Sequence, residues 1–272
     1  MGLFSRDFGK AGPGVPKGEP RKKGIPRFFE IISREYRDLM LVNVLFFLCA
    51  LPSLALFFLG LFGIFEYALM ISIFAAYPIG SALAASIFCI TRMLRDDPGF
   101  LWEDFKRKFK ENLRQAGLAG VISATFIYTQ VFLFWLPVLA DWEVAGPIWI
   151  VVGLILFLLF AMIVPYVFLH YAYIKLSSFQ IVKNSFLLAL SNILRSFFGA
   201  VMGWLPWIAL LAFIPVSVTF FPLIPVFVFS LSFLLNLMCV WPVFNKHFEV
   251  EETLVKRQKE SMETVESMEQ QD

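Results

Sequence analysis

The chain has 272 residues, of which 59% are hydrophobic and only 16% are charged. A soluble domain carries about 25% charged residues, because most of its surface has to be wetted. The composition therefore excludes a single soluble globular domain and indicates an integral membrane protein. The net charge of +2 says little, but the distribution of the charges along the chain predicts the topology.

The N-terminal residues 1–25 are rich in Gly, Pro and Lys/Arg, which predicts a disordered basic arm. Between residues 26 and 38, aromatic and aliphatic side chains share one helical face opposite several arginines. This pattern predicts an amphipathic helix on the membrane surface. Two spans follow at about 39–61 and 64–91, because these apolar runs are long enough to cross about 30 Å of hydrocarbon.

A polar segment after the second span is predicted to form a second surface helix over residues 98–113. Asp97 is of the type found at N-caps, and Pro98 of the type found at first helical positions. Aromatic residues along this helix, with bases among them, are the candidates for contact with lipid or a protein partner. The simpler alternative is that they only anchor the helix in the interface. These candidates are Phe100, Trp102, Phe105, Phe109, Lys106, Arg107, Lys108 and Lys110.

Two further spans are predicted at about 115–138 and 147–171, and a third amphipathic segment follows over 176–192. Ser177 and Gln180 have the spacing of a capping box at the start of that segment. Each odd-numbered span is thus preceded by an aromatic amphipathic segment. The pattern suggests three units of surface helix plus hairpin, although few residues are identical between them.

The last apolar run, from residue 196 to 245, contains no charged residue and is too long for one span. Three prolines predict a turn inside it, which places spans at about 196–216 and 223–244. The prolines are Pro215, Pro222 and Pro225. The predicted fold class is therefore all-α, with a six-helix membrane domain over 26–247 and an acidic, solvated tail over 248–272.

The basic residues are segregated along the chain. All 23 lysines and arginines fall before residue 38, between 92 and 114, between 175 and 195, or after 245. With six spans these four segments lie on one side of the membrane, which the positive-inside rule identifies as cytoplasmic. We therefore expect both termini in the cytoplasm. Because the basic segments adjoin spans, we expect them to contact anionic lipid rather than nucleic acid.

Residues that would carry catalysis or ion coupling are scarce. The chain has two histidines, His170 and His247, and no motif typical of a zinc protease, a phosphate-binding loop or a serine hydrolase. We therefore predict no enzymatic activity, no cofactor and no metal site. His170 is expected to be a polar tip at the membrane interface. The middles of the predicted spans lack acidic and basic residues, which weakens the case for an ion-coupled carrier.

Several stretches of the chain resemble the YesL-like proteins, a bacterial family of polytopic membrane proteins of unknown function. The resembling stretches are the leader from Phe8 to Ile31, the segment from Asn43 to Pro52, above all the segment from Asp96 to Ala116, and more weakly the segment from Asn184 to Phe197. The resemblance implies a plasma-membrane protein of Firmicute-type bacteria, often encoded near genes for carbohydrate uptake and degradation. It implies no known activity.

Three functions stay open at this point. The first is a non-enzymatic accessory or regulatory component associated with a carbohydrate transporter, suggested by the bare spans and the aromatic surface helices. The second is a permease or small-molecule-binding membrane subunit for an uncharged solute, which a polar cavity at mid-membrane would favour and a tightly packed bundle would disfavour. The third is an unrecognised membrane enzyme, which would need a buried cluster of titratable groups.

Overall fold

The computed structural model describes residues 21–139, 146–212, 224–256 and 260, and in these ranges it contains helices and no strand. Six helices of the described chain are long and apolar enough to cross a membrane, which confirms the predicted all-α polytopic fold. The helices are α1 (Ile25–Leu61), α2 (Ala68–Ala75), α3 (Tyr77–Arg95), α4 (Leu101–Leu139), α5 (Gly146–Tyr173), α6 (Ser178–Ser191), α7 (Ile193–Ala212) and α9 (Ile224–Phe248).

Two of the predicted surface helices are continuous with the spans that follow them. α1 joins the segment 26–38 to the span 39–61, and its backbone leaves helical geometry only at Glu35 (φ −111°, ψ 18°). α4 likewise joins the segment 98–113 to the span 115–138. α1 bends at Glu35, so the first surface segment is set off from its span by a kink, whereas the second surface segment is an extension of its membrane helix. The third, α6, is a separate helix.

Other predicted boundaries shift for local reasons. The span predicted at 64–91 is divided into α2 and α3, because Pro78 lies in the first turn of α3, where a missing backbone N–H costs no hydrogen bond. The capping box of α6 is confirmed, with Ser177 and Gln180 each accepting the other's backbone N–H. Of the prolines predicted to form the last turn, Pro215 and Pro222 lie outside the described residues, and Pro225 stands in the first turn of α9.

The predicted terminal segments lie mostly outside the described residues, but their inner ends belong to the folded bundle. Val250, in the tail predicted to be solvated, is 6% exposed and packs in the core. The Asn245 side-chain oxygen accepts the backbone N–H of Glu251 at 2.9 Å, which turns the chain back onto the end of α9. The acidic tail therefore does not begin at residue 248 as a solvated segment.

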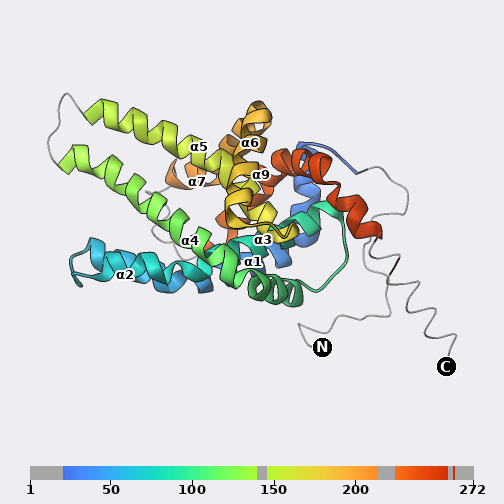
Figure 1. Ribbon diagram of the computed structural model, residues 1–272, viewed down its shortest axis with the longest axis horizontal. Helices are drawn as coiled ribbons and strands as arrows, with labels where there is room; N and C mark the ends of the chain where they lie inside the picture. Colours follow the sequence, from blue (N-terminus) through green and yellow to red (C-terminus); the bar gives the residue numbers. More distant parts are fainter. Residues whose placement is uncertain (1–20, 140–145, 213–223, 257–259, 261–272) are drawn as a thin grey trace.

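α3 is the central helix of the bundle. Every residue from Gly80 to Met93 is buried, and the helix packs against α1, α4, α5 and α9 (Figure 1). Small side chains predominate in its first half, where neighbouring helices approach most closely, as is usual where membrane helices pack. α3 thus fixes the positions of the other spans.

α3 and α4 approach each other so closely that glycine is required at the crossing. A Cβ atom on Gly80 would lie 1.9 Å from the carbonyl oxygen of Ala116 and 2.6 Å from the backbone nitrogen of Gly120. Both of these neighbours are backbone atoms and cannot rotate away. The crossing therefore depends on the missing side chains.

Buried polar side chains join the spans within the apolar interior. The Asn43 side chain donates to the Ser230 hydroxyl at 2.9 Å and accepts the Ser230 backbone N–H at 2.7 Å, which ties α1 to α9. The Ser53 hydroxyl donates to the Ser72 carbonyl at 2.8 Å and lies 2.9 Å from the Tyr128 hydroxyl. These buried polar groups thus satisfy one another between helices, as is usual where membrane helices pack.

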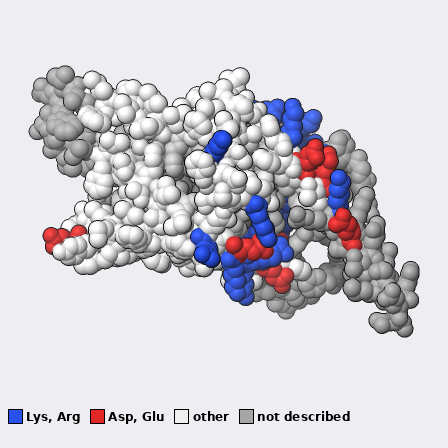
Figure 2. Space-filling model, in the orientation of Figure 1, with Lys and Arg blue, Asp and Glu red and all other residues white. Residues whose placement is uncertain are grey.

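Most charged residues of the described chain lie toward one end of the bundle. Figure 2 shows the lysines and arginines from the centre of the view to its right side, beside most of the aspartates and glutamates, with one small acidic patch at the left end. We call this region the charged end. It comprises the first half of α1, the last turn of α3, the first turns of α4 and the residues around the end of α9. The turn between α1 and α2 lies at the opposite end (Figure 1).

We expect Gly80→Ala to destabilise the protein by about 2–3 kcal/mol, because the new methyl group forces α3 and α4 apart. Thermal unfolding of the purified protein in detergent measures the change. Gly153→Ala is the matched control, since its Cβ would meet only ordinary contacts at 3.5 Å or more. An equal melting temperature for both variants would contradict the close α3–α4 crossing.

Candidate functional site

The last turn of α3 ends in an unusual residue. Asp96 adopts the left-handed conformation (φ 61°, ψ 26°), in which glycine is normally favoured. Its N–H donates to the Met93 carbonyl at 3.3 Å, and the N–H of Asp97 donates to the Arg92 carbonyl at 3.2 Å. These two bonds form a Schellman motif. A carboxylate therefore stands where glycine would close the helix with less strain.

Three arginines from the N-terminal part of the chain surround the Asp96 carboxylate. Arg27 lies 2.7 Å from it, Arg34 lies 2.5 Å from it and Arg21 lies 3.3 Å from it. The Arg27 side chain is only 6% exposed and the Asp96 side chain is 18% exposed, so this part of the cluster is largely shielded from water. Three positive charges thus converge on one partly buried carboxylate.

The same arginines also donate hydrogen bonds to the carbonyl groups that end α3. Such carbonyls have no partner within the helix, and the helix dipole gives this end a partial negative charge. Arg27 donates to Leu94 at 2.9 Å, Arg34 to Met93 at 3.3 Å and Arg21 to Arg95 at 2.6 Å. The start of α1 and the residues before it are therefore fixed to the end of the central helix.

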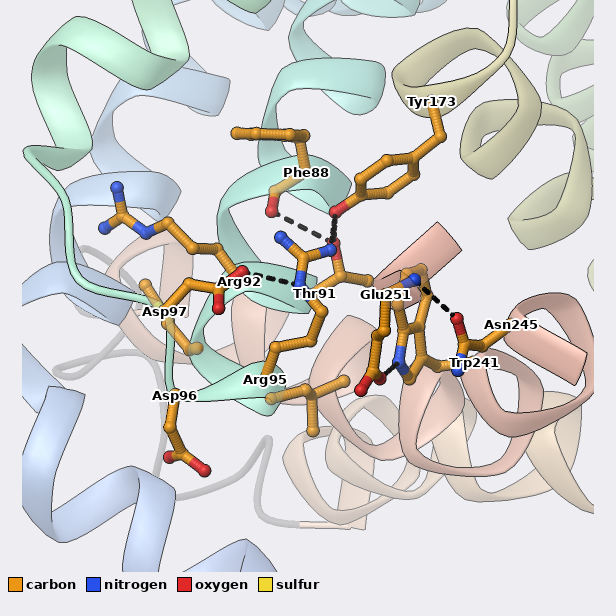
Figure 3. A network of polar contacts seen from close by, with 12 residues as sticks. Phe88, Thr91, Arg92, Arg95, Asp96, Asp97, Tyr173, Trp241, Asn245 and Glu251 are labelled. Atoms are coloured by element: carbon orange, nitrogen blue, oxygen red, sulfur yellow. Dashed lines mark hydrogen bonds and ion pairs between the residues drawn. The ribbon is translucent and has the colours of Figure 1, made fainter. Parts of the chain in front are cut away.

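Two arginines of α3 itself extend the network to other helices. Arg92 forms an ion pair with Asp104 of α4 and reaches Asp38 of α1 at 3.9 Å. Arg95 donates to Asp97 at 2.7 Å and to the hydroxyl of Tyr173, at the end of α5, at 2.6 Å (Figure 3). Each of the two arginines is 5% exposed. Through them the end of α3 is joined to α1, α4 and α5.

The end of α9 completes the network. The Arg95 guanidinium lies 5.3 Å from the ring centre of Trp241, close enough for a cation–π contact. Trp241 donates its ring N–H to Glu251 at 3.0 Å, and Glu251 also pairs with Arg21 at 3.2 Å (Figure 3). The network therefore links residues that are 230 positions apart in the sequence.

The chemistry of this site is that of ion pairing rather than of a reactive group. Its carboxylates are engaged by guanidinium groups, and its guanidinium groups by carboxylates, carbonyls and aromatic rings. Within the part of the chain that the structure describes, no three His, Cys, Asp or Glu residues are grouped to hold a metal ion. The site holds the charged end in one conformation and sets its surface charge.

The structure separates the predicted contact residues into two sets. Phe100 and Trp102 are 57% and 56% exposed, and three bases of the same segment, Lys106, Arg107 and Lys110, are also exposed. Phe100 directly precedes α4, and the other four exposed residues lie in the first ten residues of that helix.

The other predicted contact residues face the bundle. Phe105 is 5% exposed and lies in the core, Phe109 packs against the core, and Lys108 lies over the Phe88 ring at 4.9 Å. Phe105 therefore does not belong to the exposed contact surface, because α4 turns this side chain toward the core. The predicted N-cap at Asp97 is also corrected, since α4 begins at Leu101 and the Asp97 carboxylate is taken by Arg95.

His170, expected at the membrane interface, is fully buried. Its Nδ1 atom lies 2.8 Å from the Tyr166 carbonyl and 3.0 Å from the Ser185 hydroxyl of α6. The rings of Phe244 and Phe248 meet it edge-on at 5.0 Å. α6 folds back over the end of α5 and covers the histidine, which the apolar pattern alone did not predict.

No motif in the sequence identified the residues at the centre of the network. Asp96, Arg92 and Arg95 were counted only as charges in a polar segment. One signal could have identified them: two arginines and two aspartates directly follow an apolar run, at a helix end that has no glycine. The fold and this site together define a polytopic all-α membrane protein with an ion-paired end. The chain matches no protein-family model, no curated protein and no solved structure.

We expect Asp96→Gly to destabilise the protein by about 2–3 kcal/mol, because the buried Arg27 and the half-buried Arg34 lose their carboxylate. This loss outweighs the relief of the left-handed backbone that glycine brings. Chemical or thermal unfolding in detergent measures this change.

The control is Glu249→Gly, at the other described non-glycine residue with a positive φ (48°), whose side chain is exposed. It should alter the stability by no more than about 0.5 kcal/mol. If Asp96→Gly were neutral or stabilising, the carboxylate would have no structural role.

Proposed function

We propose that this protein is a non-enzymatic accessory component of a carbohydrate uptake system, placed in a bacterial plasma membrane with its charged end and both termini in the cytoplasm. The orientation follows from the positive-inside rule applied to the basic segments. The uptake system and the bacterial membrane follow from the resemblance to the YesL-like proteins. Two of the resembling segments contribute Arg21, Arg27 and Asp96, which meet in the network.

One observation carries the proposal of a partner: the exposed aromatic face at the start of α4. Phe100 and Trp102 present most of their rings to the outside, although Leu101 and Phe105 hold the same turn in the core. The turn is further fixed by the Arg92–Asp104 ion pair. Rigid, exposed aromatic residues are enriched in protein interfaces, because they bury a large area with little loss of side-chain entropy.

Exposed bases beside the aromatic residues favour a second contact, with anionic lipid. Lys106 and Lys110 are exposed, whereas Arg107 is shared with Asp104. Each base near an anionic surface contributes about 1 kcal/mol of attraction. Lipid headgroups would thus hold this face at the membrane surface, where a transporter subunit could meet it.

The two alternative functions, a permease and an enzyme, agree less well with the geometry. A permease for a sugar would need a polar pathway, and the cavity inside the bundle is lined almost wholly by apolar atoms. An enzyme would need a reactive cluster, and the titratable groups at the charged end are held in ion pairs. The accessory role agrees best with an ordered, charged end and an apolar interior.

The proposal predicts that a carbohydrate-transporter subunit is enriched when the tagged protein is purified from native membranes. Truncating both aromatic residues, Phe100→Ala with Trp102→Ala, should lower the recovery of that subunit at least about fivefold, since interface aromatics carry much of the binding energy. Quantitative mass spectrometry of the purified material measures the recovery.

The control variant is Phe62→Ala with Ile64→Ala. These residues are 73% and 69% exposed and lie in the turn between α1 and α2, at the opposite end of the bundle. This variant should recover the subunit at the wild-type level. Failure to enrich any transporter subunit over unrelated membrane baits would contradict the proposed function.

A further inference from the structure

A cavity of about 400 Å³ lies inside the bundle and is partly open to its surface. All six spanning helices contribute to its lining, and the atoms that face it are almost wholly apolar. Its volume falls within the range of about 300–1,000 Å³ that is usual for ligand sites. Empty voids of this size are rare in proteins, because the atoms of the wall lose van der Waals partners. We therefore expect the cavity to hold a ligand.

The cavity lies at the depth of the hydrocarbon core of a membrane. On α1 its wall extends from Phe46 to Leu54, and on α9 it extends from Phe229 to Asn236. At about 1.5 Å per helical residue, these stretches lie about 14–26 Å from Arg37 and Lys246, the nearest bases on the two helices. The hydrocarbon core is about 30 Å thick. With the bases at its surface, the cavity occupies the middle of the core and the half away from the charged end.

The outside of the bundle at this depth is also apolar. Figure 2 shows no charged residue on the described surface between the bases near the centre of the view and the acidic patch at its left end. Two residues of the cavity wall, Ile127 of α4 and Trp204 of α7, are exposed, whereas the others are buried or half-buried. The wall therefore reaches the outside at these residues, where a bilayer supplies acyl chains.

The residues of the wall include no acid and no base, and few of them are polar. The hydroxyl groups of Ser53 and Tyr128 bond to each other, and the Asn236 side-chain oxygen lies beneath the wall, where no ligand reaches it. The other polar residues of the wall are Ser123, Ser232, Trp204 and Trp207. Against such a wall, a sugar or a charged headgroup would lose most of its hydrogen bonds to water. The part of a ligand that enters the cavity is therefore apolar.

We propose that the cavity binds an acyl chain of a bilayer phospholipid, inserted from the leaflet away from the charged end, with the headgroup left at the membrane surface. Lipid tails are as apolar as the wall, so the chain is held by dispersion contacts that fill the void. Because the headgroup stays outside, the site does not distinguish between headgroups. It is separate from the charged end, where exposed bases favour anionic lipid, and it does not depend on the proposed partner.

The test compares the binding of phosphatidylcholine and phosphatidylglycerol, with identical acyl chains, to the purified protein. The protein is kept in a sterol-type detergent, which has no alkyl chain to compete, and radiolabelled lipid is followed by equilibrium gel filtration. The wild-type protein should bind the two lipids with affinities that agree within about twofold, because only the chain enters the site. Ala161→Phe from α5 and Ala124→Phe from α4 should each weaken the binding at least about tenfold, because the new ring occupies the space of the chain.

Ala55→Phe is the matched control, because it makes the same substitution at an exposed residue of α1, beside the wall residue Leu54 but outside the wall. It should keep the wild-type affinity for both lipids. Melting temperatures show which variants are folded. If the wild-type protein bound no phosphatidylcholine, or bound phosphatidylglycerol alone, the proposal would be overturned without the use of any variant. A folded cavity variant that binds lipid as well as Ala55→Phe does would also overturn it.

Discussion

The Asp96 carboxylate is the group on which the arrangement of the charged end depends. It occupies a left-handed backbone position that costs an aspartate more than a glycine, and it gathers three arginines from the start of the chain. α3 is the central helix of the bundle. The residues that bond to its end are therefore positioned by the whole bundle. Arg21, Arg27 and Arg34 thereby become part of the fold. The left-handed residue closes the helix, and its carboxylate neutralises the arginines that satisfy the last carbonyls of α3.

The sequence was sufficient to predict the membrane class, the six spans and the capping box of α6, because each depends on local patterns of apolar run, length and spacing. It failed where tertiary contacts decide. The periodicity of α4 identified Phe105 as part of an apolar stripe, but not which side of that stripe faces α3 rather than the membrane. His170 was expected at an interface because its neighbours along the chain suggested one, whereas α6 folds back and buries it. The ion pairs join residues far apart in sequence, and no spacing rule relates Arg21 to Glu251.

The charged end and the interior of the bundle have opposite chemistry. The charged end is held by ion pairs and capped carbonyls, and it presents exposed aromatic residues and bases at the start of α4. The interior of the bundle is apolar, closely packed where α3 crosses α4, and hollow where six helices surround the cavity. An almost wholly apolar chamber accommodates an apolar molecule far better than a sugar. The proposed role in carbohydrate uptake is accordingly one of association at the charged end and not of conduction through the bundle.

A double-mutant cycle on Arg27 and Asp96 tests the central claim most directly. Arg27→Met keeps an apolar stem in the bundle, and Asp96→Asn keeps a residue that tolerates the left-handed backbone, so the cycle isolates the charge interaction. The free energies of unfolding of the wild type, the two single variants and the double variant give the coupling energy. The account predicts a favourable coupling of about 1–3 kcal/mol, with the double variant more stable than the sum of the single effects implies. Strictly additive effects would contradict it, because Arg27 and Asp96 would then stabilise the fold independently of each other.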